Sequence, residues 1–245
     1  MNYKYYVFYK PYNVLNQFTK EREDHVTLAD FLSVEKDVYP VGRLDKDSEG
    51  LLLLTNDTTI NDQLLNPNNK HRRTYIVQVE NEITDNAISK LNKGVEIKLD
   101  AGLYHTKPCH VKKLNKAPVL PERDPPVRFR MNIPTSWAII ELSEGKNRQV
   151  RKMFASVGFP VLRLVRVQIE ELKLGKLEPG KYYTIKLEEL CSLLKIDIKT
   201  LIQKKSAIKN TFLNKNMESP EQTSSNKKAP KSAFNTYRDN RKKPK

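Results

Sequence analysis

Residues 41–57 of this chain read VGRLDKDSEGLLLLTND, a charged turn followed directly by an apolar run. Gly50 ends the turn, and Leu51–Leu54 is typical of a short strand buried on both of its faces. One carboxylate of the turn, Asp45, lies between two basic residues. An exposed ion pair of this kind contributes at most about 1 kcal/mol to stability. We therefore interpret the turn as a candidate site where a carboxylate meets a polyanion, although a solvated turn carboxylate is the common alternative.

Strands and helices are expected on both sides of this turn. The hydrophobic patterns predict strands at 5–9, 51–54, 75–80 and 137–142, another that starts at Pro160, and a last one at 182–187. Capping and spacing signals predict helices at 27–32, 57–65, 84–91 and 147–157. Because these elements show no steady βαβ rhythm, the predicted fold class is α+β, with a mixed sheet flanked by helices and loops. The segment 117–134, rich in proline and arginine, is predicted to be an irregular loop.

The whole chain is basic, with a formal charge of +15 and a pI near 9.6. Residues 206–245 contain ten Lys and Arg against three Asp and Glu, so the other residues keep an excess of positive charge too. Such a balance favours a folded surface that binds phosphates. A lysine-rich, merely solvated surface is the alternative.

The sequence also predicts the domain organisation and the compartment. We expect a catalytic domain over 1–187, one helix over 188–205, and a basic, disordered tail over 206–245. The two cysteines are far apart and make no disulfide framework, which fits a reducing compartment. Neither a signal peptide nor an apolar run of about 20 residues is present. The expectation is a cytoplasmic protein with no membrane partner.

The predicted helix 147–157 has two different faces. Its apolar stripe consists of Val150, Met153, Phe154 and Val157. Arginines occupy another face, and they are either solvated or include one that turns inward to a carboxylate. An inward arginine would fix the geometry of that carboxylate and keep it ionised.

Tyr75 begins a predicted strand, where a tyrosine usually packs in the core. Its ring is also suited to stacking on a base that has been flipped out of an RNA helix. Metal or cofactor chemistry finds little support, because the histidines and cysteines lack zinc-ligand spacing and no phosphate-binding or dinucleotide-binding glycine motif occurs. We therefore predict no metal and no cofactor.

Five motifs taken together resemble a known enzyme family. In chain order they are KP at 10–11, GRLD at 42–45 followed by SEGL at 48–51, TYIV at 74–77, EGKNRQVRKM at 144–153, and LEPG at 177–180. In this order and spacing the set resembles the RsuA-like pseudouridine synthases, which modify ribosomal RNA. The resemblance implies the pseudouridine synthase catalytic fold, with a mostly antiparallel, bifurcated sheet. It also implies a monomeric enzyme that needs neither metal nor cofactor.

Two further segments narrow the resemblance to one branch of the family. The first catalytic strand is expected within the opening residues, which leaves no room for the S4 RNA-binding domain that most members carry. Residues 123–128 and 133–137 resemble the RluE branch, which also lacks S4 and modifies a uridine of the large-subunit (23S) ribosomal RNA. The implied partner is that RNA or its precursor. The extension beyond about Leu187 departs from the branch.

The resemblance implies a role for each of several residues. Asp45 matches the catalytic aspartate, Arg151 the arginine that pairs with it, and Tyr75 the tyrosine that packs on the target base. Arg43 matches the arginine inserted where the flipped base had been, and Leu164 is expected to complete the pocket. The predicted substrate-binding set is Arg43, Tyr75, Arg148, Arg151 and Leu164.

Other interpretations stay open from the sequence. Asp47 and Glu49 are expected to be surface residues, but Asp45 and Asp47 together would also suit a glycosidase with two carboxylates. A non-catalytic RNA-binding factor for ribosome assembly is possible on the same fold, and so is a synthase for small-subunit ribosomal RNA.

Overall fold

The strand predicted after the charged turn is β3 (Glu49–Thr55), and every residue in it is buried. The computed structural model describes residues 2–128 and 130–206 of the chain. β3 pairs with β1 (Tyr5–Lys10), also buried throughout, in an antiparallel register that joins Lys10 to Gly50. The two apolar runs therefore form the inner part of a sheet, as their composition predicts.

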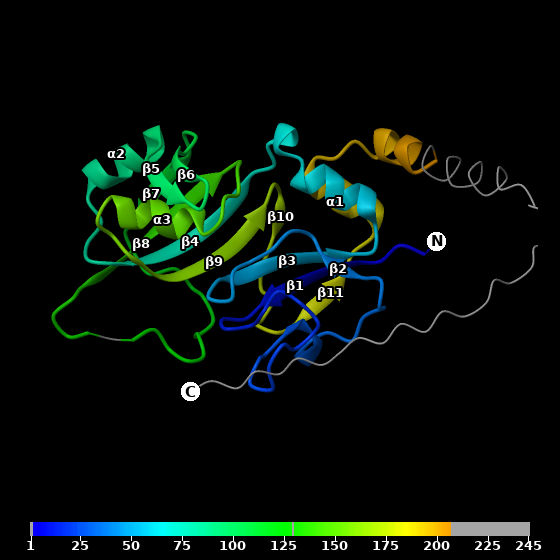
Figure 1. Cartoon of the computed structure of the whole chain (residues 1–245), viewed down its shortest axis with the longest axis horizontal. Helices are drawn as coiled ribbons and strands as arrows, with labels where there is room; N and C mark the ends of the chain where they lie inside the picture. The colour runs from blue at the N-terminus through cyan, green and yellow to red at the C-terminus, as the bar shows by residue number, and fades with distance from the viewer. Residues whose placement is uncertain (1, 129, 207–245) are drawn as a thin grey trace, which may run out of the picture. The chain divides into compact units, whose positions relative to one another are not determined.

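The main sheet has the strand order β11–β1–β3–β9–β4–β8–β7, with β2 beside β3 and β10 beside β9 (Figure 1). The bounds of its other strands are β2 (Tyr39–Pro40), β4 (Arg73–Glu80), β7 (His110–Leu114), β8 (Thr135–Leu142), β9 (Val161–Ile169), β10 (Leu172–Lys173) and β11 (Tyr182–Thr184). All of its strand pairs are antiparallel except β3 with β9. A separate hairpin joins β5 (Glu96–Leu99) to β6 (Gly102–His105). The predicted α+β class with a mostly antiparallel sheet is confirmed.

Helices cover the two halves of this sheet separately (Figure 1). The helices α1 (Thr58–Leu65) and α4 (Leu187–Leu194) pack with β1 and β3 in one core cluster. A second cluster joins α2 (Asp85–Lys93) and α3 (Gln149–Ser156) to β4 and β8. The segment between β1 and β3, which contains the short 3-10 helix η1 (Leu28–Asp30), covers the other face of the first half. Another 3-10 helix, η2 (Pro67–Asn69), follows α1.

The two halves meet at the short parallel contact between β3 and β9. There Gly50 is paired with Arg166, and its φ of +105° is one that side chains rarely adopt. A Cβ atom on Gly50 would lie 2.2 Å from the carbonyl oxygen of Arg166. Only glycine lets the backbones approach this closely, so Gly50 determines how the charged turn is placed against β9.

The C-terminal part differs from the single helix expected over 188–205. α4 ends at Leu194, Lys195 adopts a left-handed conformation with φ +56°, and a helix resumes at 198 and runs to 206. Leu201 of this second helical segment is fully buried in the core cluster of α1 and α4. The helices thus belong to the same packed unit as the rest of the described chain. Residues 207–245 of the predicted tail lie outside the described residues.

Most other element predictions differ from the structure only at their ends. The helix predicted at 27–32 is the short η1, and the last predicted strand stops at Thr184 because α4 starts at Leu187. The strands β5, β6 and β7 were not predicted, because each is only four or five residues long and carries too few apolar residues for a clear strand pattern. In the described part of the chain, no helix combines the length and apolar character that a membrane span requires.

Candidate active site

A cavity of about 530 Å³ lies where the charged turn, β4, β9 and the start of α3 meet. Five of the residues predicted as site residues line it: Arg43, Asp45, Tyr75, Arg148 and Leu164. They come from four separate segments of the chain. Convergence of polar groups on a partly apolar cavity of this size is typical of a ligand-binding or catalytic site.

Asp45 is held in place through its backbone, while its side chain stays accessible. The amide of Ser48 donates to the carbonyl of Asp45 at 3.0 Å and closes the turn. The Asp45 side chain is 37% exposed, and the nearest cation in the described structure is Arg148, with 3.9 Å between Oδ2 and Nη1. Asp45 is therefore positioned to contact a ligand in the cavity rather than locked in a close ion pair.

Lys10, the last residue of β1, holds this turn in place through hydrogen bonds. It is fully buried, and its Nζ donates to three carbonyls: Pro11 at 3.0 Å, Lys46 at 3.2 Å and Ser48 at 2.8 Å. Burial lowers the pKa of Lys10 to about 7, although the carboxylates of Glu49, Asp47 and Asp45 oppose this shift. The KP motif at 10–11 thus shapes the turn that presents Asp45.

The expected ion pair between Asp45 and Arg151 is not present, and this prediction is wrong. Arg151 instead contacts Asp47: its Nε lies 3.3 Å from Oδ2, and its Nη2 donates to the Asp47 carbonyl at 2.5 Å. Its Nη1 donates to the carbonyl of Val161 at 3.2 Å. Arg151 therefore joins the charged turn to β9 and does not line the cavity.

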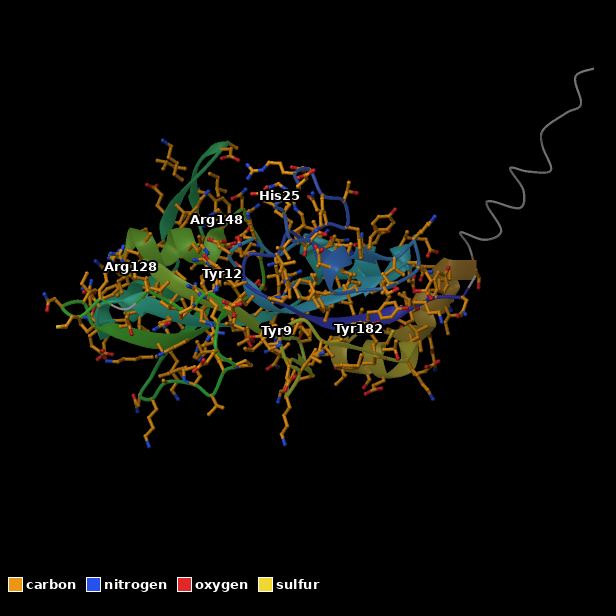
Figure 2. The ribbon with its side chains drawn as sticks, turned by 90° about the horizontal axis from the view of Figure 1, so that it is seen from below. Tyr9, Tyr12, His25, Arg128, Arg148 and Tyr182 are labelled. Atoms are coloured by element: carbon orange, nitrogen blue, oxygen red, sulfur yellow. The ribbon has the colours of Figure 1, made fainter. Side chains whose placement is uncertain are left out.

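Asp47 also binds a second arginine, Arg148, which directly precedes α3. Arg148 is labelled in Figure 2. Both Nη atoms of Arg148 donate to the Asp47 carboxylate at 2.8 Å. Burial raises the pKa of Asp47, but the hydrogen bonds from Arg148 and the charge of Arg151 outweigh burial and leave that pKa below its usual range. Asp47 stays partly exposed at the surface, but through these two arginines it also anchors the charged turn.

Glu49 was also expected at the surface, and that prediction is wrong. Glu49 is 2% exposed and accepts two hydrogen bonds from Arg163 of β9, from Nε at 2.9 Å and from Nη2 at 2.8 Å. The three carboxylates of the turn have two different functions. Asp45 faces the cavity, whereas Asp47 and Glu49 anchor the turn to α3 and β9.

Tyr75 and Leu164 form part of the cavity wall on neighbouring strands. Tyr75 of β4 is opposite Arg166 of β9, and Leu164 is opposite Val77 two positions along. Leu164 is 5% exposed, while Tyr75 is half-buried and touches two core clusters. Arg43 also lines the cavity and is exposed. The wall therefore offers an aromatic ring and an aliphatic group close to an accessible carboxylate.

Two arginines of the lining, Arg73 and Arg166, were missed from the sequence. Arg166 is 4% exposed and lies in β9, where apolar residues flank it on both sides. A charged residue in the middle of an apolar strand is the signal that would have pointed to it. No group of three or more His, Cys, Asp or Glu side chains able to hold a metal ion occurs among residues 2–128 and 130–206.

Comparisons with known proteins point to one enzyme family. A family model described as RNA pseudouridylate synthase matches residues 4–156. The ribosomal large subunit pseudouridine synthase E of Vibrio parahaemolyticus is 49% identical over 186 residues, which cover 76% of this chain and 75% of that protein. The protein of the same name from Xanthomonas campestris pv. campestris is 47% identical, covering 71% of this chain and 90% of its own length.

Proteins less similar to this chain are also pseudouridine synthases. The dual-specificity RNA pseudouridine synthase RluF of Shigella flexneri is 34% identical over 76% of this chain and 56% of its own length. A crystal structure of a pseudouridylate synthase superposes with a TM-score of 0.64 at 24% identity, covering 79% of this chain and 74% of the other, which supports the fold. By family model, relatives and fold, the chain belongs to the RNA pseudouridylate synthases.

Proposed function

We propose that this chain isomerises a specific uridine of large-subunit (23S) ribosomal RNA to pseudouridine, with Asp45 as the essential carboxylate. The observation that carries the proposal is the convergence of Asp45, Tyr75 and Leu164 on one cavity with basic residues at its edge. The choice of RNA is supported by relatives at 46–49% identity that are named as large-subunit synthases. The partner on this account is ribosomal RNA in the cytoplasm, where ribosomes are assembled.

The reaction moves the base without any net oxidation or reduction. The bond between ribose C1′ and uracil N1 breaks, the base turns, and a bond forms between C1′ and C5. C5 loses a proton and N1 gains one, so the atoms balance. A chain that runs this reaction must present one carboxylate to the ribose and base, and Asp45 is the accessible carboxylate in the lining of the described cavity.

The uridine must first leave its stack, which costs a few kcal/mol. Contacts between basic side chains and phosphates supply binding free energy that offsets this cost. Arg43, exposed at the edge of the cavity, is suited to occupying the space left by the flipped base. Tyr75 and Leu164 then pack on the base, and exclusion of water by this wall limits hydrolysis of the detached base.

The competing two-carboxylate mechanism is disfavoured by the surroundings of Asp47. Its carboxylate is bound by Arg148 on both oxygens, and it does not belong to the cavity lining. A glycosidase would need both carboxylates at the same bond. Asp45 alone has the position that the proposed chemistry requires.

Pseudouridine mapping in ribosomal RNA tests the choice of substrate. A strain that lacks the gene is compared with one that carries it, and both ribosomal subunits are mapped at single-nucleotide resolution. We expect one site of the large-subunit RNA to lose its modification in the deletion strain. Loss confined to the small-subunit RNA would favour the alternative synthase, and no loss in either RNA would favour a non-catalytic assembly factor.

A further inference from the structure

Two arginines of the cavity wall, the buried Arg166 and the partly buried Arg73, form no ion pair with a described carboxylate. Arg166 is 4% exposed, and its Nε donates to the carbonyl of Leu51 at 2.7 Å. Its Nη2 is buried and has no hydrogen-bond partner among the described residues. Arg73 reaches the same cavity from β4, and its two Nη atoms donate to the carbonyls of His71 at 3.2 Å and Leu64 at 2.9 Å.

These two arginines differ from the other buried arginines near the site. Arg163 is bidentate to Glu49, and Arg151 pairs with Asp47. Within the described residues, by contrast, no carboxylate oxygen lies within 4.0 Å of a nitrogen of Arg73 or Arg166. Burial and the positive charge of Arg166 lower the pKa of Arg73, although Tyr75 and the more distant Glu170 oppose this shift. The pair is therefore a local excess of positive charge.

Such an excess is unfavourable until an anion enters the cavity. A buried cation without a partner costs several kcal/mol, and an uncharged acceptor offsets only part of this cost. Carbonyls of Leu51, His71 and Leu64 hold the two guanidinium groups in place, so the site is already organised before a ligand binds. Arginine in a fixed orientation binds phosphate oxygens with two parallel hydrogen bonds, which lysine cannot do.

We propose that Arg73 and Arg166 form a phosphate-binding subsite inside the cavity, which takes a phosphodiester group of the RNA next to the flipped uridine. This inference rests on the proposed function, because RNA supplies the phosphate. A carbonyl of the uracil ring is the other acceptor that the free Nη2 of Arg166 would fit. It carries no full negative charge and leaves the excess positive charge uncompensated, so the phosphate is favoured.

Nucleotide-binding measurements on the full chain distinguish a phosphate from a uracil carbonyl as the acceptor. The affinities of uridine, uridine 3′-monophosphate and uridine 5′-monophosphate are measured by calorimetry on the unaltered protein and on Arg166→Met and Arg73→Met. One charge-assisted phosphate contact is expected to make one monophosphate bind about tenfold more tightly than uridine. Both variants should lose this preference while they still bind uridine.

Arg22→Met is the matched control, because Arg22 is 68% exposed, pairs with Asp24 and lies outside the cavity. It removes the same charge and should keep the preference for a monophosphate. Thermal melting checks folding, and Arg73→Met keeps the test valid if Arg166→Met fails to fold. A purely structural role would lower the melting temperature and leave the preference intact, which would overturn the proposal.

Two further results would overturn the proposal. One is equal weakening of uridine and both monophosphates in the variants, which would assign Arg166 to the base. The other is no preference for a phosphate in the unaltered protein. Failure of the proposed function would look different. If the chain prefers a monophosphate through these arginines but forms no pseudouridine, the phosphate subsite stands and the proposed synthase activity is wrong.

Discussion

Asp45 and Asp47 are two residues apart in one turn, yet their surroundings differ. Asp47 is bound by Arg148 and Arg151, and the carboxylate of Asp45 lies 3.9 Å from its nearest described cation. Asp45 thus remains accessible to a substrate, while Asp47 fixes the turn that presents it. An accessible carboxylate on a firmly held backbone is what positioning for catalysis requires.

Arg151→Met should weaken both activity and stability, although Arg151 does not touch Asp45. It removes the hydrogen bonds to the carbonyls of Asp47 and Val161 and leaves a partly buried carboxylate with one arginine. We expect a loss of about 2 kcal/mol in the free energy of unfolding and a fall in kcat on the order of tenfold from misplacement of the turn.

Urea unfolding and single-turnover pseudouridine formation measure these two effects. Lys152→Met serves as the control, since it removes a charge from the same helix outside the cavity lining. Full activity together with unchanged stability in Arg151→Met would show that the turn does not depend on this arginine.

At the scale of elements, the contact between β3 and β9 positions the turn. Gly50 lies against the backbone of Arg166, and Glu49 is bound to Arg163 of the same strand. The parallel contact spans only two paired positions. A small change in the distance between these strands would therefore move both the Asp45 turn and the arginine of the cavity wall.

Gly50→Ala should be severely destabilising, because the new Cβ would meet the Arg166 carbonyl oxygen at 2.2 Å. Backbone strain and overpacking together are expected to cost roughly 3 kcal/mol or more. Gly102→Ala is the matched control: its φ is +117°, but a Cβ there has no atom within 4 Å. Urea denaturation of both variants measures the difference, and equal losses would argue against the close approach of β3 and β9.

The sequence was sufficient for the fold class and for most elements of the sheet, because apolar runs such as Leu51–Leu54 have one stable place in a mixed sheet. It also identified five residues that line the cavity. It did not predict which carboxylate meets which arginine, since a shift of two residues in a tight turn exchanges Asp45 for Asp47. Arg166 was missed because β9 contains two arginines among apolar residues, and only the fold shows that Arg163 pairs with Glu49 while Arg166 faces the cavity.

At the scale of the whole molecule, one buried carboxylate links the beginning, middle and end of the described chain. Asp57 caps α1 by accepting from the amide of Thr59 at 3.1 Å, and Tyr5 of β1 donates to it at 2.7 Å. Lys205 of the last helical segment forms an ion pair with the same carboxylate. Burial raises the pKa of Asp57, but the bonds from Lys205, Thr59 and Tyr5 outweigh burial, so the pKa is lowered.

A lowered carboxyl pKa makes this link sensitive to acid in a defined direction. The stabilisation is fully present above the usual pKa of about 3.9 and is lost as the pH falls through the lower folded-state value. Asp57→Asn should therefore cost about 3 kcal/mol at pH 7, and the difference from the unaltered protein should shrink below about pH 4. Urea unfolding from pH 7 to pH 2.5 measures it; a constant difference over that range would contradict the account.

The basic C-terminal segment 207–245 is predicted to add affinity for RNA rather than to support the fold. Residues up to Ser206 form a compact unit of their own. Deletion of 207–245 should leave the free energy of unfolding unchanged and weaken RNA binding, with a shallower dependence of the logarithm of affinity on the logarithm of salt concentration. Filter binding at several salt concentrations tests this, and an unchanged slope would remove the segment from the RNA interface.

Tritium release from labelled RNA shows whether Asp45 in this cavity carries out uridine isomerisation. Large-subunit ribosomal RNA labelled with tritium at C5 of uridine is incubated with the purified chain, with Asp45→Asn, or with Asp47→Asn. The account predicts release by the unaltered chain, none above background by Asp45→Asn although RNA binding is retained, and reduced but measurable release by Asp47→Asn. Normal release by a folded Asp45→Asn would contradict it.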